Sequence, residues 1–297
     1  MINQPHPNKI IVVIGATATN KTEVGITLAQ AFCGEIINAD AFQVYRELNL
    51  GVNKPTTAQL KTAKFHLISH ISIKDTWDIK RFQQEANTVI QTIYARHKIP
   101  IIVGGSHLYI DALIKNYDLD TNQARDERFV NLTNQELQLK LRAYNEKLAT
   151  NIGNNHKRLV RALQNLTDHN PMHQTKTPNY TPCYIWCTKP REQLYQDIDN
   201  RVDHMIKNGW FEEVNHIIQH TPAYQHLNAF KAIGYLSIAR GLLNPQIEID
   251  VNKIKQQTRQ YAKRQITWIR HHYPDVYVYD QNNISGVLKH IKTWLDR

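Results

Sequence analysis

A short loop near the amino terminus has the residue types and spacing of a phosphate-binding site. The P-loop pattern is Gly, four variable residues, Gly, Lys and then Ser or Thr, and here Gly15, Lys21 and Thr22 are in register. The backbone N–H groups of such a loop surround phosphate oxygens at the start of a helix, while the Lys adds positive charge and the hydroxyl can bind Mg²⁺. The sequence therefore predicts a site for a di- or triphosphate, formed by Gly15, Ala16, Thr17, Ala18, Thr19, Asn20, Lys21 and Thr22.

Asn20 occupies the place of the second Gly in this pattern. Gly is used there because it adopts a positive φ and allows close approach of a ligand, and Asn is one of the few other residues that tolerate the left-handed region. The alternative is an ordinary Thr-rich turn between a strand and a helix. The preceding apolar run 9–14, the Lys-Thr register and the following helical stretch 23–32 favour the phosphate site.

Two further segments place polar groups directly after predicted strands. Asp40 opens the segment 40–45, where a carboxylate could hold a metal or accept a proton, or could instead only cap a short turn. Gly104 and Gly105 precede Ser106 and allow close approach of a ligand; the alternative is a tight turn with a helix cap. We expect both segments to face the phosphate loop, because ligands bind at the carboxyl ends of parallel strands.

Basic residues are the third chemical feature. The net charge is +10 with a pI near 9.4, and the stretch 251–270 has six Lys or Arg and no acid. Lys157, Arg158 and Arg161 lie on about one helical turn. Such runs are usually solvated faces, but an uncompensated run of this length indicates contact with a nucleic-acid backbone. Arg201, by contrast, is expected from its spacing to form only a surface ion pair with Asp197.

The elements that carry these residues alternate between strand and helix, which predicts a parallel sheet with crossover helices. We expect an α/β fold with a P-loop NTPase-like parallel sheet flanked by helices, and a small all-helical insertion at 118–152 within a core of 1–117 and 153–297. The expected strands are 10–14, 35–38, 65–71, 99–103, 184–187 and 276–279, and the expected helices are 21–32, 79–97, 107–115, 155–166, 191–207, 211–219, 251–271 and 284–295.

Composition excludes several classes of protein. No stretch approaches the roughly 20 apolar residues that cross a bilayer, and the first residues lack the charged start and apolar core of an export signal. The three cysteines, Cys33, Cys183 and Cys187, predict neither a disulfide framework nor a zinc site. We therefore expect a cytoplasmic protein without a membrane contact. We also expect it to act as a monomer.

Taken together, the motifs resemble those of the bacterial type of tRNA dimethylallyltransferase, in order along nearly the whole chain. The departures from the family pattern are Asn20 for Gly, Ala41 for Ser, Asn53 for Ala and His107 for a third Gly. Asn20 and His107 are expected to add bulk near the substrate. The resemblance is carried by the phosphate loop and by the segments 40–45, 51–56, 101–109, 157–163, 200–205, 209–214, 232–235 and 261–270.

The resemblance implies a mechanism as well as a fold. The loop would hold the diphosphate of dimethylallyl diphosphate, with Lys21, Arg201, and Mg²⁺ bound by Thr22, neutralising the leaving group. Asp40 would take the proton from N6 of an adenosine that is extruded from the tRNA, with Gln43 and Ser106 positioning the base. The residues implied to contact the anticodon arm of tRNA are Asp40, Ala41, Phe42, Gln43, Ser106, Arg128, Lys157, Arg158, Arg161 and Lys263.

Three alternatives remain open from the sequence. A small-molecule kinase would use the same loop for ATP, which explains Lys21 and Thr22 but not the basic helix. Prenylation of free adenine nucleotides would need no nucleic-acid surface. A non-catalytic tRNA-binding homologue is suggested by Asn20 and His107.

Overall fold

The structure is a computed structural model that describes residues 8–119, 127–167, 177–280 and 283–297. The start of the chain, on which the prediction about an export signal rests, and residues 120–126 of the predicted insertion lie outside these ranges. Contacts between residues divide the chain into two compact units, one formed by Met1–Ile114 with Asn179–Arg297 and the other by Lys115–Pro178. Each unit is described separately.

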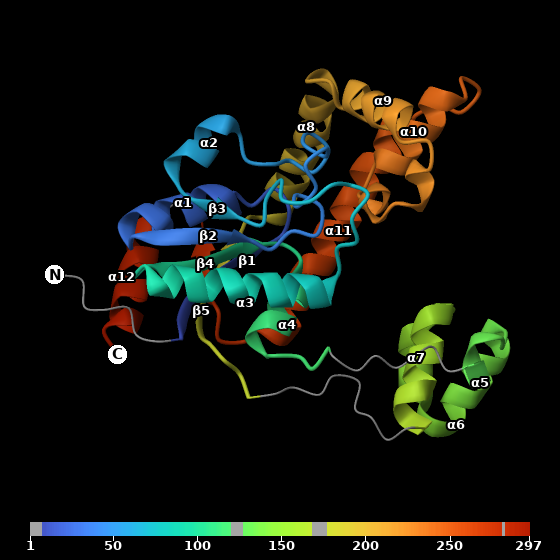
Figure 1. The fold of residues 1–297 in the computed structure, drawn as a ribbon, viewed down its shortest axis with the longest axis horizontal. Coiled ribbons are helices and arrows are strands. Elements are labelled where there is room, and N and C mark those ends of the chain that lie inside the picture. The colour runs from blue at the N-terminus through green and yellow to red at the C-terminus, as the bar shows by residue number, and fades with distance from the viewer. Residues whose placement is uncertain (1–7, 120–126, 168–176, 281–282) are drawn as a thin grey trace. The chain divides into compact units, whose positions relative to one another are not determined.

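The first unit is built on a six-stranded sheet in the order β3-β2-β4-β1-β5-β6, in which every pairing is parallel (Figure 1). This confirms the predicted α/β fold class. The strands β1, β2 and β4 are neighbours, so the three segments that follow them emerge at one edge of the sheet. The strands are β1 (Lys9–Gly15), β2 (Gly34–Asn38), β3 (Phe65–His66), β4 (Ile99–Gly104), β5 (Thr181–Thr188) and β6 (Tyr277–Asp280).

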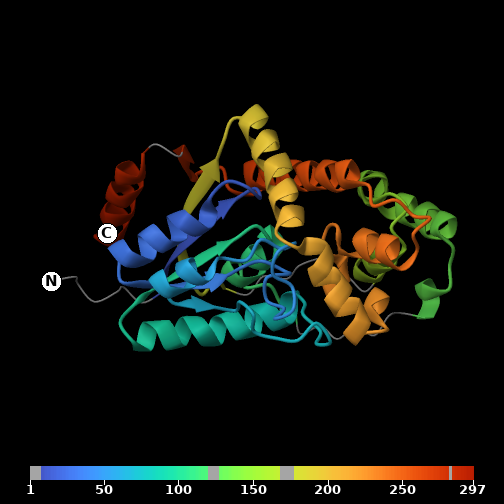
Figure 2. The same ribbon diagram turned by 90° about the horizontal axis from the view of Figure 1, so that it is seen from above.

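Both faces of the sheet are buried, which explains why the central strands are apolar throughout rather than alternating. In β1, Ile10 and Val12 belong to the core under α3 (Ile79–Ala95), α4 (His107–Ile114) and α11 (Val251–His272). The intervening residues pack instead against α1 (Lys21–Ala31) and α12 (Ile284–Leu295). Figure 2 shows the strands between α3 on one side and α1 and α12 on the other.

The segment between β2 and α3 differs from the prediction. The expected strand 65–71 is only two residues long, because its pairing with β2 stops at His66 and the backbone turns through positive φ at Leu67. A helix that the sequence analysis does not predict, α2 (Thr57–Thr62), precedes it. Thr56 and Gln59 form a reciprocal capping box at its start, a signature that is present in the sequence and that the prediction misses.

The carboxyl-terminal half of the first unit adds a helical layer beside the sheet. It consists of α8 (Arg191–Lys207), α9 (Trp210–His220), two short 3₁₀ helices (Tyr224–His226 and Asn228–Lys231), α10 (Tyr235–Leu243) and the long α11. Trp210 and Tyr235 are fully buried in the main core and fix α9 and α10 against one another, with their rings 5.7 Å apart. None of the helices in the described part of the chain is long and apolar enough to cross a membrane.

The second unit is all-helical, as predicted, but larger than the expected 118–152. Its helices are α5 (Glu127–Val130), α6 (Asn134–Ile152) and α7 (His156–Thr167). Leu159 and Leu163 of α7 are fully buried in one cluster with Leu137 and Leu141 of α6. Helix α7, which the prediction places in the core, therefore belongs to the insertion, because its apolar stripe packs on α6.

Candidate functional site

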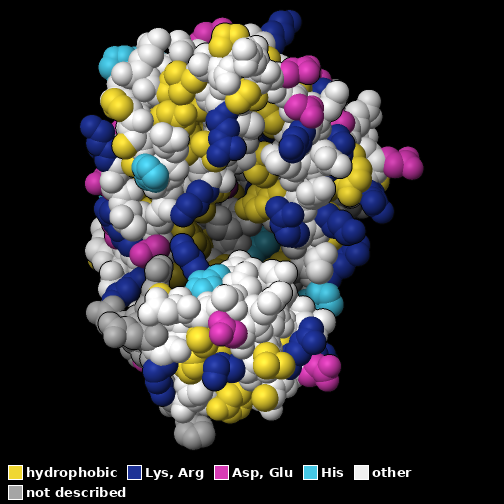
Figure 3. All heavy atoms as spheres, turned by 90° about the vertical axis from the view of Figure 1, so that its right-hand side faces the viewer, with side chains coloured by type: hydrophobic (Ala, Val, Ile, Leu, Met, Phe, Trp, Pro, Cys, Tyr) yellow, Lys and Arg dark blue, Asp and Glu magenta, His cyan; other side chains and the backbone are white. Residues whose placement is uncertain are grey.

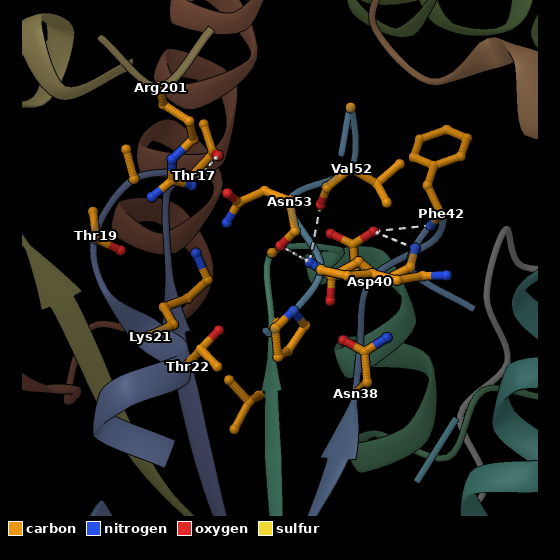
Figure 4. Close-up of a pocket in the computed structure, with 18 of the residues that line it drawn as sticks. Thr17, Thr19, Lys21, Thr22, Asn38, Asp40, Phe42, Val52, Asn53 and Arg201 are labelled. Carbon is orange, nitrogen blue, oxygen red and sulfur yellow. Dashed lines mark hydrogen bonds between the residues drawn. The ribbon is translucent and has the colours of Figure 1, made fainter. Parts of the chain in front are cut away.

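A cavity of about 580 Å³ lies in the first unit, at the carboxyl edge of β1, β2 and β4. Its walls come from the phosphate loop, the segment after β2, the loop 51–56, the turn after β4 and the helices α8, α9 and α11. Figure 4 shows the phosphate loop and Arg201 on one side and Asp40 with Phe42 on the other. The structure thus brings together the segments that the sequence marked as chemical.

The phosphate loop keeps an open shape although it lacks the second Gly. Asn20 has φ 58° and ψ 28°, in the left-handed region, and immediately precedes α1. This confirms the conformation expected for Asn at that place. Inside the loop, the Thr19 hydroxyl and the Lys21 ammonium both donate to the carbonyl of Ala16, at 2.8 and 2.5 Å. These contacts place the Lys21 ammonium over the loop, where its positive charge would stabilise a bound phosphate.

Lys21 and Arg201 both bring positive charge to the phosphate end of the cavity. Burial lowers the pKa of Lys21 to about 8, and it also lowers that of Arg201. Arg201 reaches the loop from α8, with its Nη1 3.4 Å from the hydroxyl of Thr17 (Figure 4). The surface pair expected with Asp197 is wrong, because Asp197 binds Lys189 instead, at 2.6 Å.

Asp40 lies across the cavity from these cations. Its Oδ1 accepts hydrogen bonds from the backbone N–H groups of Phe42 and Gln43, at 2.9 and 3.2 Å. The carboxylate therefore does cap its own turn, but this role uses only one oxygen, and Oδ2 has no partner among the described residues. Burial raises the pKa of Asp40, which makes it a stronger base than an exposed carboxylate.

The remaining residues predicted to hold the base support the turn around Asp40. The hydroxyl of Ser106 accepts a hydrogen bond from the N–H of Ala41 at 3.0 Å, and neither residue lines the cavity. Gln43 does line it, and its amide donates to the carbonyls of Val52 and Asn53, at 3.1 and 3.0 Å. Gln43 and Ser106 thus fix the two loops that flank Asp40.

Gln265 of α11 is absent from the sequence prediction, yet it connects two loops of the site. Its Oε1 accepts from the N–H of Thr17 at 2.9 Å, and its Nε2 donates to the carbonyl of Gly105 at 2.9 Å. A Cβ at Gly105 would lie 2.3 Å from that Nε2, so a side chain there would displace the Gln265 carboxamide. One feature of the sequence indicates this role. Gln265 is a polar residue on the apolar side of a basic helix, four residues before the buried Ile269.

The loop between β2 and α2 is anchored by residues outside the prediction. Glu213 of α9 accepts from the N–H groups of Asn49 and Leu50, at 3.0 and 2.8 Å. Gly51 lies against Trp210, so that a Cβ would come within 2.1 Å of the indole nitrogen. The segments 51–56 and 209–214, which the sequence analysis gives only as motifs, therefore pack against one another.

His107 does not add bulk to the cavity, contrary to the expectation. Only 5% of its surface is exposed, and it is not among the cavity-lining residues. Neither ring nitrogen has a hydrogen-bond partner within the described residues. Burial, with smaller contributions from Lys21 and His272, lowers the pKa of His107 to about 3, so the ring is neutral. A buried neutral imidazole of this kind fills space behind the turn after β4.

The basic stripe on α11 is partly neutralised, which corrects the view that it lacks compensation. Lys255 binds Asp203 at 2.6 Å and Arg259 binds Asp199, both on the neighbouring α8. The compensating acids lie on another helix, so the sequence of α11 alone does not reveal them. Lys263 remains exposed. Lys and Arg side chains are spread over the face drawn in Figure 3, in keeping with the net charge of +10.

The cations predicted on the insertion lie on its surface. Lys157, Arg158 and Arg161 are all exposed on α7, opposite its buried leucines, and none of the three forms an ion pair within the described ranges. Arg128 is exposed on α5 and lies over the ring of Phe129, 5.4 Å from its centre.

Comparison with known proteins identifies the family. The IPP transferase family model matches residues 43–272. A tRNA dimethylallyltransferase of Malacoplasma penetrans is 39% identical over 270 residues, 88% of this chain and 89% of that protein. One from Staphylococcus aureus (strain bovine RF122 / ET3-1) is 35% identical over 294 residues, 93% of this chain and 94% of that protein.

Solved structures agree with the sequence comparison. The full-length tRNA isopentenylpyrophosphate transferase of Bacillus halodurans superposes with a TM-score of 0.75 at 27% identity, covering 97% of each chain. A eukaryotic dimethylallyltransferase acting on tRNA gives a TM-score of 0.80 at 26% identity, covering 96% of this chain and 78% of that one. The two relatives compared by sequence are both named tRNA dimethylallyltransferases. The chain therefore belongs to the IPP transferase family.

Proposed function

We propose that this protein transfers a dimethylallyl group from dimethylallyl diphosphate to N6 of the adenosine on the 3′ side of the anticodon in tRNA. The observation that carries the proposal is that one cavity contains both cations that can bind a diphosphate and a carboxylate that can accept a proton. Lys21 and Arg201 line its phosphate end, and Asp40, whose pKa burial raises, lines the other side. The family relationship and the tRNA substrates named for its relatives support the same function.

The proposed reaction exchanges one bond for another. The allylic C–O bond to the diphosphate breaks, the N6–C bond forms, and the N6 proton passes to Asp40. Lys21 and Arg201 stabilise the negative charge that develops on the leaving diphosphate, and the backbone N–H groups at the start of α1 add to this. The adenine must leave its stack to reach Asp40, and the cavity gives it a place to enter.

Mg²⁺ fits the residues present if it arrives with the diphosphate. Thr22 lines the cavity next to Lys21 and offers a hydroxyl ligand. Among the described residues no group of three His, Cys, Asp or Glu side chains could hold a metal by itself. This donor set suits Mg²⁺, which commonly keeps water and substrate phosphate oxygens as ligands. When bound, the ion would neutralise diphosphate charge during bond cleavage.

We propose that the anticodon arm binds through exposed cations, with Lys157, Arg158 and Arg161 on the insertion and Lys263 on α11. Arg128 is a further contact in this proposal. We also propose that the protein acts as a monomer in the cytoplasm.

The test mixes purified protein, Mg²⁺, dimethylallyl diphosphate and unmodified tRNA, and detects prenyl-adenosine by mass spectrometry. Parallel reactions replace tRNA with AMP, or the prenyl donor with ATP. Product on tRNA alone is expected. Prenylated AMP would indicate a free-nucleotide enzyme, ATP hydrolysis without prenyl product a kinase, and tRNA binding with no reaction a non-catalytic homologue.

Asp40→Asn is the matched variant, because it keeps the cap on Phe42 but removes the base. We expect turnover to fall by about 100-fold or more, since general-base catalysis contributes on this order, while tRNA affinity stays within about twofold. Unchanged turnover would overturn the role of Asp40.

A further inference from the structure

Asn53 brings a polar side chain into the cavity from the loop opposite the phosphate loop. It lines the cavity together with Lys21 and Arg201. In Figure 4 its carboxamide extends from the side of Val52 toward Arg201 and the phosphate loop.

The backbone at Asn53 is held on both sides, so the direction of its Cα–Cβ bond is fixed. Its N–H donates to the carbonyl of Leu50 at 2.9 Å, and its carbonyl accepts from Nε2 of Gln43 at 3.0 Å. Glu213 holds the start of the same loop. The carboxamide itself makes no hydrogen bond with any of the described residues. A fixed backbone with an unused donor is suited to binding a ligand.

The charges around the carboxamide indicate what that ligand is. Lys21 and Arg201 make this end of the cavity a site for an anion, and Lys54 adds a further cation to the lining. An anion held by Lys21 and Arg201 would present further oxygens to the cavity that Asn53 also lines. The NH₂ group of Asn53 can donate to such an oxygen without adding charge.

Resting on the function proposed above, we propose that the Asn53 carboxamide binds the diphosphate of the prenyl donor from the side opposite the phosphate loop. It supplies a neutral hydrogen-bond donor to the diphosphate. The contact acts mainly on donor affinity, because it exists before the C–O bond breaks.

The competing explanation is purely structural. Asn53 has φ 50°, and Asn is favoured at positive φ without any ligand. Asn53→Gly and Asn53→Asp separate the two explanations. Both residues tolerate this backbone, but Gly removes the donor, while Asp keeps the size and replaces the donor with a negative charge.

The experiment measures binding of inorganic diphosphate, dimethylallyl diphosphate and ATP by calorimetry without tRNA, then steady-state kinetics with tRNA. Asn8→Gly is the matched control, because Asn8 is also exposed at positive φ (77°) and does not line the cavity. For Asn53→Gly we expect affinity for inorganic diphosphate and the prenyl donor to fall about tenfold, KM for the donor to rise to match, and kcat and tRNA affinity to change little. Asn53→Asp should weaken both ligands further.

Two results would overturn the proposal. One is diphosphate affinity in Asn53→Gly equal to that of Asn8→Gly, which leaves only the backbone role. The other is a loss confined to tRNA affinity, which assigns the carboxamide to the base. The binding measurements do not depend on turnover, so the two proposals can fail separately. If the unchanged protein forms no prenyl-adenosine, the proposed reaction is wrong. If the protein binds ATP more tightly than the prenyl donor, the anion that Asn53 contacts belongs to a nucleotide.

Discussion

Gln265 accepts a hydrogen bond from the backbone N–H of Thr17 at 2.9 Å, across 248 residues of sequence. Through its Nε2 it also holds the carbonyl of Gly105, so one carboxamide fixes the phosphate loop to the turn after β4. Gln265 touches neither reacting atom in the proposed mechanism. It is a positioning residue, which sets the separation between the diphosphate and the groups around Asp40.

Gln265→Leu should therefore impair catalysis as well as folding stability. The substitution leaves the N–H of Thr17 and the carbonyl of Gly105 without their partner, at a cost of about 1–3 kcal/mol for each group that stays dry. We expect kcat to fall at least tenfold, together with a loss of up to about 6 kcal/mol in the free energy of unfolding if both groups stay dry. Gln257→Leu, at an exposed position of the same helix, is the control. Equal effects of the two variants on kcat would remove the positioning role.

The lowered pKa of Lys21 predicts an alkaline limit to donor binding. Because burial favours the neutral amine, Lys21 loses its proton above about pH 8 in the free protein. We expect kcat/KM for the donor to fall above that pH, while kcat stays level, since a bound diphosphate restores the charged form. Lys21→Arg, whose side chain stays charged, should shift this limit upward even if its activity is lower. A limit unchanged in Lys21→Arg would point to Lys54, whose pKa burial also lowers to about 8.

Neutralising the exposed face of α7 should weaken tRNA binding in a salt-dependent way. The combined Lys157→Ala, Arg158→Ala and Arg161→Ala variant is expected to reduce the steepness of log K against log salt by about 1 for each tRNA phosphate that it no longer neutralises. Lys289→Ala with Lys292→Ala is the control, because α12 contributes no residue to the cavity and both lysines are exposed. Filter binding from 50 to 300 mM KCl, on the order of the range where such slopes are measured, gives the comparison. Parallel lines for the unchanged and triple-variant proteins would remove α7 from the interface.

Substitutions at Asn20 should follow backbone preference rather than side-chain chemistry. Asn20 is in the left-handed region and its side chain makes no capping hydrogen bond. Asn20→Gly is expected to keep diphosphate affinity and stability, whereas Asn20→Val should lose about 1–2 kcal/mol of unfolding free energy, because a Cβ-branched residue is strained there. Chemical denaturation and calorimetry test both. A large loss of affinity in Asn20→Gly would show that the carboxamide itself binds phosphate.

The local chemistry of this site was readable in the sequence. Gly15, Lys21 and Thr22 have the P-loop register, and the apolar strands before Asp40 and Gly104 required a sheet buried on both faces. These features depend on neighbours a few residues away, so the pattern alone contains them. The family resemblance rested on the same short motifs, and the comparisons confirm it.

Tertiary structure decided everything that joins distant segments. Arg201 contacts Thr17 of the phosphate loop rather than pairing with Asp197. Gln265 connects two loops, and Lys255 of α11 pairs with a carboxylate on α8. Helix α7 belongs to the insertion because Leu159 packs on α6. In each case the partner is chosen by packing between elements far apart in the chain, and hydrophobic periodicity says which face is buried but not what will cover it.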